Sequence, residues 1–319
     1  MDRSDIIGHK AQITLLENDV KNGNVSHAYL FAGSPFVGKT TVARWFAEEL
    51  MTQGMEREQK GETIRQMEKL IQPDFLILDQ LWIEEQCDDF DVIAQSTNLP
   101  QQHRAKPPTA KTDTIGIDDV REIQERVNET GNGPWRVCII RGIERMQEAA
   151  ANSFLKTLEE PPPRRVFLLT TDSLSSVIPT ILSRTRVLHF ERVAERDIRS
   201  QLSGLDDDDA AFVLHLAQGA PGMAMRLAAD PDLRRAEKIL HTQAVSFWGA
   251  RTLIERLHIL VPLTERGPDA DRFLVHLALA LRETPQEKHV QERALMELIR
   301  GLETNANRHL LVQRFAMSL

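Results

Sequence analysis

Short apolar runs alternate with amphipathic segments along the first two thirds of the chain. The mainly apolar runs are expected to form buried strands at 28–32, 75–78, 137–140, 166–169 and 187–190. Strands without polar alternation are typical of a sheet that is covered on both faces. Because helical segments separate them, the pattern predicts an α/β domain with a parallel sheet.

The segments between these runs have helical periodicity. An opening helix is expected within 4–25, a second within 41–51, and a charged helical segment follows at 52–70. Asp118 is the expected N-cap of a helix with Val120, Ile123 and Val127 on one face. A further helix from about 147 to 160 ends at three consecutive prolines.

The composition changes after Arg192, where strand-like runs cease and helices are expected at 195–203, 207–218, 221–229 and from 232 onward. The predicted organisation is therefore an α/β domain, a small helical lid and an all-helical collar. Their expected bounds are 1–191, 192–231 and 232–319, and residues 80–114 form an insert in the first domain.

Composition narrows the possible functions. The 319 residues carry a net charge of −8, so the chain by itself is not expected to bind DNA by neutralising its phosphates. The N-terminus lacks an apolar signal core and no run is long enough for a membrane helix, which predicts a cytoplasmic protein. Cys87 and Cys138 are too few for a disulfide framework.

Residues 33–40 read Gly-Ser-Pro-Phe-Val-Gly-Lys-Thr, which matches the phosphate-binding P-loop pattern. The loop lies between a predicted strand and the start of a helix, where the helix dipole favours an anion. An ordinary glycine-rich turn is the alternative, but this context favours a nucleotide site. Lys39 would contact phosphate and Thr40 would hold Mg²⁺. The candidate nucleotide-binding residues of the loop are Gly33, Ser34, Gly38, Lys39, Thr40 and Thr41.

The acidic groups that normally accompany a P-loop are missing from their usual place. A P-loop ATPase needs a carboxylate after the third strand to hold the Mg²⁺ shell, and commonly a second one to orient water. Here the strand at 137–140 runs into Arg141 and Gly142. Glu144 follows, but it would need an unusual backbone path to substitute. We therefore expect at most weak ATP hydrolysis.

Arg184 precedes the fifth predicted strand and has two interpretations. From spacing alone, a surface arginine that caps a helix end or pairs with a carboxylate is favoured. The alternative is an arginine finger that stabilises transition-state charge on the nucleotide of a neighbouring subunit.

Several stretches resemble the bacterial clamp-loader branch of the AAA+ ATPases. The most specific are the Leu-Glu-Glu-Pro sequence at 158–161 and the Ser-Arg pair at 183–184. The similarity covers about residues 6–190, and the collar resembles the family more loosely around 305–311. The matching stretches are 7–9, 27–33, 115–117, 120–121, 136–140, 146–162 and 179–184.

Within this branch, the missing acidic groups point to the delta-prime family of DNA polymerase III clamp-loader subunits. The lid segment 219–224 also lacks the arginine of the Gly-Ser-x-Arg pattern. The resemblance implies a rigid partner that does not hydrolyse ATP and offers Arg184 as a finger to an adjacent motor. It further implies that Ile7 and Gly8 lie near the base, and that Thr170 or Thr171 occupies the sensor position, although both could be plain strand-end threonines.

The resemblance also implies partners and cofactors. The partners would be gamma/tau-type motor and delta-type subunits, with primer-template DNA and the sliding clamp reached through the complex. ATP or ADP, with Mg²⁺ on Thr40, would be bound without turnover. Many family members carry a four-cysteine zinc module, but 52–72 contains no cysteine, so no zinc is expected. The alternatives are an active AAA+ ATPase, such as a motor subunit or branch-migration helicase, and a standalone ATP-binding regulator.

Overall fold

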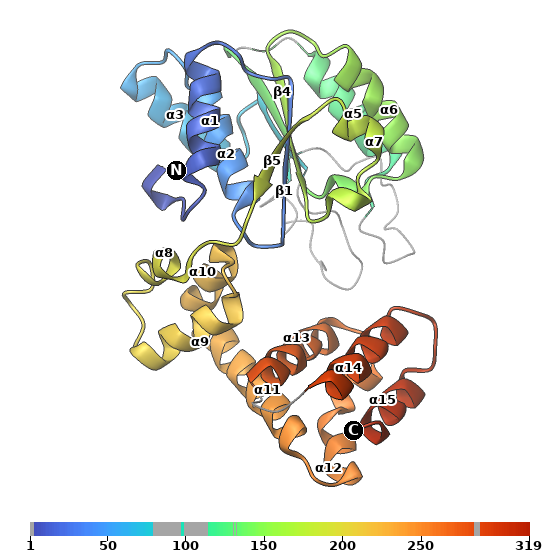
Figure 1. Cartoon of the computed structure of the whole chain (residues 1–319). Coiled ribbons are helices and arrows are strands. Elements are labelled where there is room, and N and C mark those ends of the chain that lie inside the picture. Colours follow the sequence, from blue (N-terminus) through green and yellow to red (C-terminus); the bar gives the residue numbers. More distant parts are fainter. Residues whose placement is uncertain (1–2, 79–96, 99–113, 130, 132, 284–287) are drawn as a thin grey trace. The chain divides into compact units, whose positions relative to one another are not determined.

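The chain divides into two compact units. The computed structural model describes residues 3–78, 97–98, 114–129, 131, 133–283 and 288–319 (Figure 1). The first unit comprises 1–201 and 218–223, and the second comprises 202–217 and 224–319. The division into three domains remains a prediction. Apart from 97–98 and 114, the insert 80–114 lies outside the described residues.

A five-stranded parallel sheet forms the centre of the first unit, in the order β2-β3-β4-β1-β5. Its strands are β1 (Ala28–Gly33), β2 (Phe75–Leu78), β3 (Arg136–Ile140), β4 (Arg165–Thr171) and β5 (Arg186–Phe190). Its helices are α1 (Lys10–Lys21), α2 (Lys39–Met51), α3 (Arg57–Glu68), α5 (Ile117–Asn128), α6 (Glu148–Glu159), α7 (Pro179–Leu182) and α8 (Glu195–Arg199). Short 3₁₀ helices are η1 (Arg3–Asp5), η2 (Ile143–Arg145) and η3 (Leu174–Ser176).

Successive strand residues point into two separate cores because side chains alternate across a sheet. Tyr29 and Phe31 pack on one face with α1, α2 and α3, whereas Ala28 and Leu30 pack on the other with α5, α6 and α7. Figure 1 shows these two helical layers on opposite sides of the sheet. The apolar runs are continuous because both faces are buried, which confirms the predicted α/β class.

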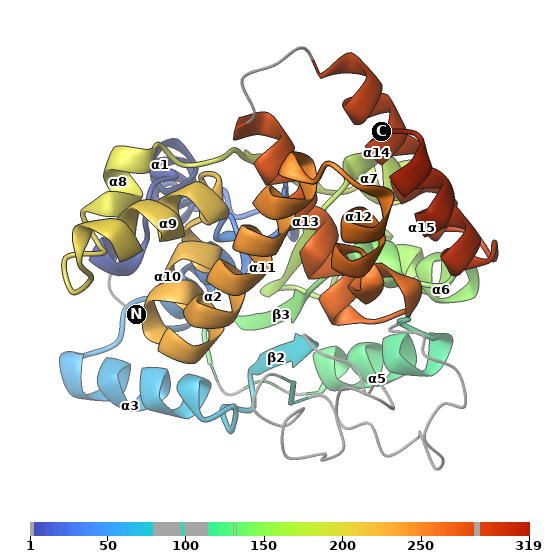
Figure 2. The same cartoon turned by 90° about the horizontal axis from the view of Figure 1, so that it is seen from below.

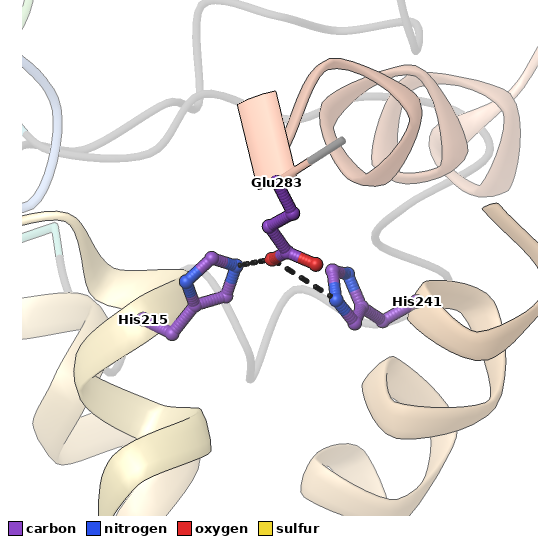
Figure 3. A group of neighbouring side chains, drawn as sticks. All are labelled: His215, His241 and Glu283. Atoms are coloured by element: carbon purple, nitrogen blue, oxygen red, sulfur yellow. Dashed lines mark ion pairs between the residues drawn. The ribbon is translucent and has the colours of Figure 1, made fainter. Parts of the chain in front are cut away.

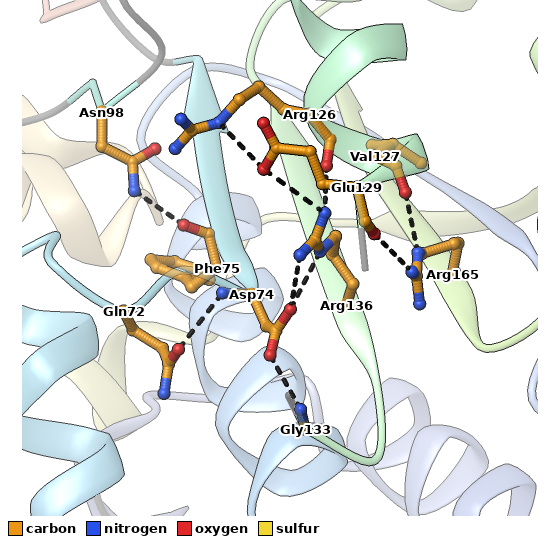
Figure 4. Close-up of polar contacts among 10 residues, drawn as sticks. All are labelled: Gln72, Asp74, Phe75, Asn98, Arg126, Val127, Glu129, Gly133, Arg136 and Arg165. Carbon is orange, nitrogen blue, oxygen red and sulfur yellow. Dashed lines mark hydrogen bonds and ion pairs between the residues drawn. The ribbon is translucent and has the colours of Figure 1, made fainter. Parts of the chain in front are cut away.

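A buried ion pair joins the N-terminal ends of β2 and β3 (Figure 4). Asp74 and Arg136 are 2% and 3% exposed, and Oδ1 of Asp74 accepts from Nε of Arg136 at 2.9 Å and from Nη2 at 2.8 Å. Oδ2 accepts from the backbone N–H of Gly133 at 2.8 Å, and Arg136 also donates to the carbonyl of Arg126. Buried charges are tolerated only when paired in this way. The contacts therefore hold the N-terminal ends of β2 and β3 together, whereas the P-loop follows the C-terminal end of β1.

Side chains hydrogen-bond backbone groups on the outer side of both edge strands. At β2, which lies beside β3 in Figure 2, Oδ1 of Asn98 accepts from Ile77 N–H at 2.8 Å and Nδ2 donates to Phe75 O at 2.6 Å. The backbone N–H of Asn98 also donates to Ile77 O at 3.2 Å. At β5, Gln12 donates to the carbonyl of His189 at 2.6 Å.

The N-terminal part of the chain differs from the sequence expectation. The opening helix is shorter than 4–25, because Gly8 and His9 have φ angles of 81° and 56° and so interrupt it before α1. Left-handed backbone cannot continue an α-helix.

The predicted cap of α5 is wrong. Gly116, not Asp118, is the N-cap, and the carboxylate of Asp119 accepts from the Gly116 N–H at 2.8 Å. Asp118 and Asp119 follow one another in sequence, and only the backbone path decides which of the two carboxylates reaches the Gly116 N–H.

The second unit is all helical. Its helices are α9 (Asp207–Ala217), α11 (Pro231–Gly249), α12 (Leu253–Ile259), α13 (Pro268–Glu283), α14 (His289–Leu302) and α15 (Arg308–Met317), with η4 at Val261–Thr264. The helix α10 (Pro221–Ala229) begins in the first unit and ends in the second. The core of α11 to α15 includes Phe247, Phe273 and Phe315, where Phe247 stacks on Phe315 at 5.5 Å between centroids.

Candidate functional site

The P-loop connects the end of β1 to the start of α2. Gly38 has a φ of 107°, which glycine adopts readily, and the helix begins at Lys39. A Cβ at Gly33 would lie 2.2 Å from the carbonyl oxygen of Phe190, so only glycine permits this approach of β1 to β5. The first N–H groups of α2 have no intrahelical partner, so the end of the helix can receive an anion. Ser34, Thr40 and Thr41, also predicted to contact nucleotide, are partly exposed in this segment.

Lys39 is held by three oxygen atoms. Its side chain is 7% exposed, and Nζ lies 2.6 Å from Gly33 O, 2.8 Å from Ser34 O and 2.6 Å from Oδ1 of Asp172. Asp172 directly follows β4, and its side chain is 52% exposed. The ammonium group therefore lies at the carboxyl end of the sheet, where ligands bind in open α/β folds.

Two contacts from distant segments hold the loop backbone. Nε2 of His9 lies 2.7 Å from Val37 O, and the imidazole packs against the Phe190 ring with 4.7 Å between centroids. Burial lowers the pKa of His9, against the opposing effect of its hydrogen bond to Val37. Phe36, with a φ of 61°, accepts a hydrogen bond from the Gly222 N–H at 2.8 Å.

Ile7 and Gly8 lie next to His9, so the structure brings this predicted segment close to the P-loop. Gly8 has a φ of 81°, and a Cβ there would lie 2.7 Å from Cγ2 of Val193. The glycine is thus required by both its backbone conformation and its close approach to Val193.

The predicted sensor threonines occupy the end of β4. Oγ1 of Thr170 accepts from Gly142 N–H at 3.1 Å, whereas Oγ1 of Thr171 donates to Ser173 O at 2.9 Å and accepts from Ser173 N–H at 3.1 Å. Both residues are buried. Their hydroxyl groups organise the turns after β3 and β4, and the sensor role of Thr170 or Thr171 stays a prediction.

Sequence reasoning considered Glu144 without being able to place it, and it missed Asp172 at the carboxyl end of the sheet. Gly142, with a φ of 68°, and the following 3₁₀ helix supply the unusual path that places Oε1 of Glu144 at 3.1 Å from the Asp172 N–H. Oε2 of Glu144 is buried without a hydrogen-bond partner among the described residues. The sequence signal was a glycine before Glu144, and for Asp172 its position directly after the two threonines.

The lid segment has no room for a side chain at the position where the Gly-Ser-x-Arg pattern places arginine. Gly222 occupies that position, and a Cβ there would lie 2.8 Å from Phe36 O. The preceding Gly219, with a φ of 80°, accepts from the Val193 N–H at 2.8 Å. Backbone contacts therefore join this segment to the P-loop and to the chain after β5.

Arg184 lies away from the P-loop contacts described above and is one-third exposed. Its Nη2 lies 2.7 Å from Oε1 of Glu159, and its Nη1 donates to Thr180 O at 3.0 Å and to Ser183 Oγ at 3.1 Å. In the isolated chain, Arg184 therefore pairs with a carboxylate on α6, as the surface-arginine interpretation expects. The remaining exposed third of the side chain is open to contact from outside.

The loop fits a phosphate group. The first N–H groups of α2, which have no intrahelical partner, follow Gly38, and Lys39 supplies a cation at the same end of the helix. Thr40 would hold Mg²⁺ through its hydroxyl, because this is the metal-contacting position of the motif. Lys39 would then exchange part of its contact with Asp172 for phosphate oxygens.

This parallel sheet, its P-loop and the helical C-terminal region define an AAA+ P-loop fold. The sequence profile of the family described as DNA polymerase III, delta subunit, matches residues 8–194. The chain belongs to this family and is a clamp-loader-family subunit of the delta-prime type, which confirms the resemblance inferred from the sequence.

Individual relatives include both delta-prime and tau subunits of DNA polymerase III. DNA polymerase III subunit delta-prime of Haemophilus influenzae is 31% identical over 223 residues, covering 66% of this chain and 64% of the relative. DNA polymerase III subunit tau of Bacillus subtilis is 26% identical over 246 residues, covering 77% and 38%. The chain therefore spans less than two thirds of the length of these relatives.

A solved structure supports the fold. A DNA polymerase III gamma subunit-related protein from Thermotoga maritima has a TM-score of 0.55 at 20% identity, covering 95% of this chain and 97% of that one.

Within the described residues, none of the helices combines the length and apolar character that crossing a membrane requires.

Proposed function

We propose that this chain is a clamp-loader subunit that binds nucleotide without turning it over and that supports a neighbouring motor subunit. The observation that carries this proposal is the end of β3, where Arg141 and Gly142 stand in place of the acidic pair that a P-loop motor needs. A cation at the metal-holding position opposes Mg²⁺ coordination by simple charge repulsion.

The lid supports the same proposal. Gly222 replaces the lid arginine, and its backbone contact with Phe36 leaves no space for a longer side chain. A site without the acidic pair and without the lid arginine lacks two of the groups that stabilise charge during phosphoryl transfer. The retained loop would then serve to hold a nucleotide and to stiffen the subunit.

Arg184 is proposed to act in trans. Clamp-loader relatives include tau and gamma proteins, which would be the motor subunits, and delta-type subunits would complete the hetero-oligomer. Glu159 holds the guanidinium in a defined position near the surface. From there it would contact the nucleotide of the adjoining motor, and primer-template DNA and the sliding clamp would be engaged through the assembled complex.

An ATPase assay on the purified chain tests the proposal that it binds nucleotide without turning it over, which is called the scaffold proposal below. We expect ATP binding that Lys39→Ala weakens, together with no steady-state turnover above the Lys39→Ala background. Binding and turnover are measured on the same preparation, so that failure to bind is not mistaken for failure to hydrolyse. Steady turnover that Lys39→Ala abolishes would overturn the proposal.

One observation favours the second candidate, an active ATPase. Glu144 and Asp172 bring two carboxylates to the carboxyl end of the sheet, and Asp172 already contacts Lys39. If they replaced the missing acidic pair, Glu144→Gln and Asp172→Asn would each remove turnover by the purified chain while leaving ATP binding. The scaffold proposal expects no turnover to remove.

A further inference from the structure

Two imidazoles and one carboxylate converge between three helices of the second unit (Figure 3). His215 comes from α9, His241 from α11, and Glu283 is the last residue of α13. Oε1 of Glu283 lies 2.7 Å from Nε2 of His215 and 3.4 Å from Nε2 of His241. One ligand atom from each residue lies within 4.8 Å of the others.

These separations suit a small metal ion. Zinc–nitrogen and zinc–oxygen bonds of about 2.0–2.1 Å place neighbouring ligand atoms of a tetrahedral site about 3.3 Å apart. The two distances from Oε1 of Glu283, 2.7 and 3.4 Å, bracket this value. Two imidazoles and a carboxylate are a ligand set that zinc uses when the fourth position is left to water.

Aromatic and imidazole rings pack around His241 and fix its position. His241 packs against Phe212 at 5.9 Å and against the imidazoles of His215 at 5.3 Å and His276 at 5.6 Å between centroids.

Nearby charges are already matched, so the cluster is not needed to neutralise them. Nε2 of His276 lies 2.6 Å from Oε2 of Glu237, and Oε1 of Glu237 accepts from Nε of Arg272 at 2.8 Å. Nδ1 of His241 is buried with no hydrogen-bond partner among the described residues. Hydrogen bonding within the protein therefore does not fully satisfy the His241 ring, which a purely structural histidine would normally achieve.

We propose that His215, His241 and Glu283 bind one divalent transition-metal ion of the zinc class, with water in the fourth position. The ion would join α9 to α11 and α13. Its three protein ligands are 26 to 68 positions apart in sequence. This site is independent of the proposed clamp-loader function. It also differs from the cysteine module whose absence led to the expectation of no zinc, because all its ligands are histidine and glutamate.

Metal binding is tested on the full chain after treatment with a chelator and dialysis. Zn²⁺ is titrated by calorimetry, and Co²⁺ by visible absorption, whose intensity reports a tetrahedral site. We expect one ion per chain in excess Mg²⁺, weaker binding at acidic pH, and an increase in the melting temperature with Zn²⁺. The site would be overturned if the wild-type chain bound neither Co²⁺ nor Zn²⁺, or if the ligand variants bound them as well as the wild type does.

The variants separate binding from folding. His241→Ala and Glu283→Gln are each expected to weaken Zn²⁺ binding at least about 10-fold, the scale on which losses at metal sites are measured. His289→Ala is the matched control, because that side chain is 92% exposed and lies on α14. If His241→Ala lowers the metal-free melting temperature, Glu283→Gln at the exposed end of α13 decides the outcome. Undiminished binding in Glu283→Gln and in His215→Ala would refute the proposal.

Discussion

Gly222 donates its backbone N–H to the carbonyl oxygen of Phe36 at 2.8 Å and thereby joins the start of α10 to the phosphate-binding loop. The contact leaves no room for a side chain at Gly222, because a Cβ there would lie 2.8 Å from the Phe36 oxygen. The loop itself is bent at Phe36, whose φ is 61°. The position of the lid arginine in the Gly-Ser-x-Arg pattern is thus occupied by main chain.

Gly222→Ala is expected to disturb the loop. The added methyl group must displace backbone, which costs about 1–3 kcal/mol as overpacking does in a core. We expect a lower melting temperature and weaker ATP binding, measured by thermal unfolding and calorimetry. Gly249→Ala is the control, because a Cβ there meets nothing within 4 Å. Unchanged melting and binding in Gly222→Ala would show that the contact does not constrain the loop.

Arg184→Ala is expected to lower the ATPase activity of the reconstituted clamp loader without preventing assembly. An arginine finger contributes about 10³–10⁵ in kcat at the site it serves, so that one site would become nearly inactive. Activity and subunit stoichiometry are measured on the same complex. Arg196→Ala is a suitable control, since its side chain is 87% exposed. Full activity with Arg184→Ala would exclude the finger.

Glu159→Ala tests whether the ion pair positions that finger. Removing the carboxylate 2.7 Å from Nη2 of Arg184 leaves the guanidinium charged but less well ordered. We expect an intermediate loss of complex ATPase, smaller than that of Arg184→Ala, with unchanged assembly. A loss equal to that of Arg184→Ala would indicate that the carboxylate itself is needed in the contact.

Arg136→Met is expected to destabilise the first unit by about 3–5 kcal/mol, because it leaves the buried carboxylate of Asp74 without its charged partner. The measurement is chemical unfolding followed separately for the two units. The double variant Asp74→Leu/Arg136→Met should regain part of this loss, since no uncompensated charge remains. Its recovery should be incomplete, because the Gly133 N–H and the Arg126 carbonyl lose their partners.

Glu237 should contribute a pH-dependent part of the stability of the second unit. Burial raises the pKa of Glu237, but the hydrogen bond from His276 and the charge of Arg272 outweigh it, so the pKa lies below its ordinary value. The stabilisation is therefore complete above the unfolded-state pKa of about 4.3 and is lost as pH falls through the folded-state pKa. Melting temperatures measured between about pH 3 and 6 should fall less steeply for Glu237→Gln. Identical slopes would contradict this assignment.

The sequence predicts the sheet well because its strands are continuous apolar runs, a signal that burial on both faces makes unambiguous. The P-loop can also be predicted from the sequence, since glycine, lysine and threonine occur at a fixed spacing. Glu144 could not be placed in this way, because its approach to Asp172 depends on left-handed backbone at Gly142. The cluster of His215, His241 and Glu283 could not be predicted from the sequence, because its residues come from three separate helices.

The covered edges of the sheet limit how this subunit can join others. Asn98 occupies the outward backbone groups of Ile77 and Phe75, and Gln12 occupies that of His189. A strand from a neighbouring chain would have to displace these side chains before it could add to either side. Occupied edge groups of this kind oppose strand addition and so protect the free chain from edge-to-edge aggregation.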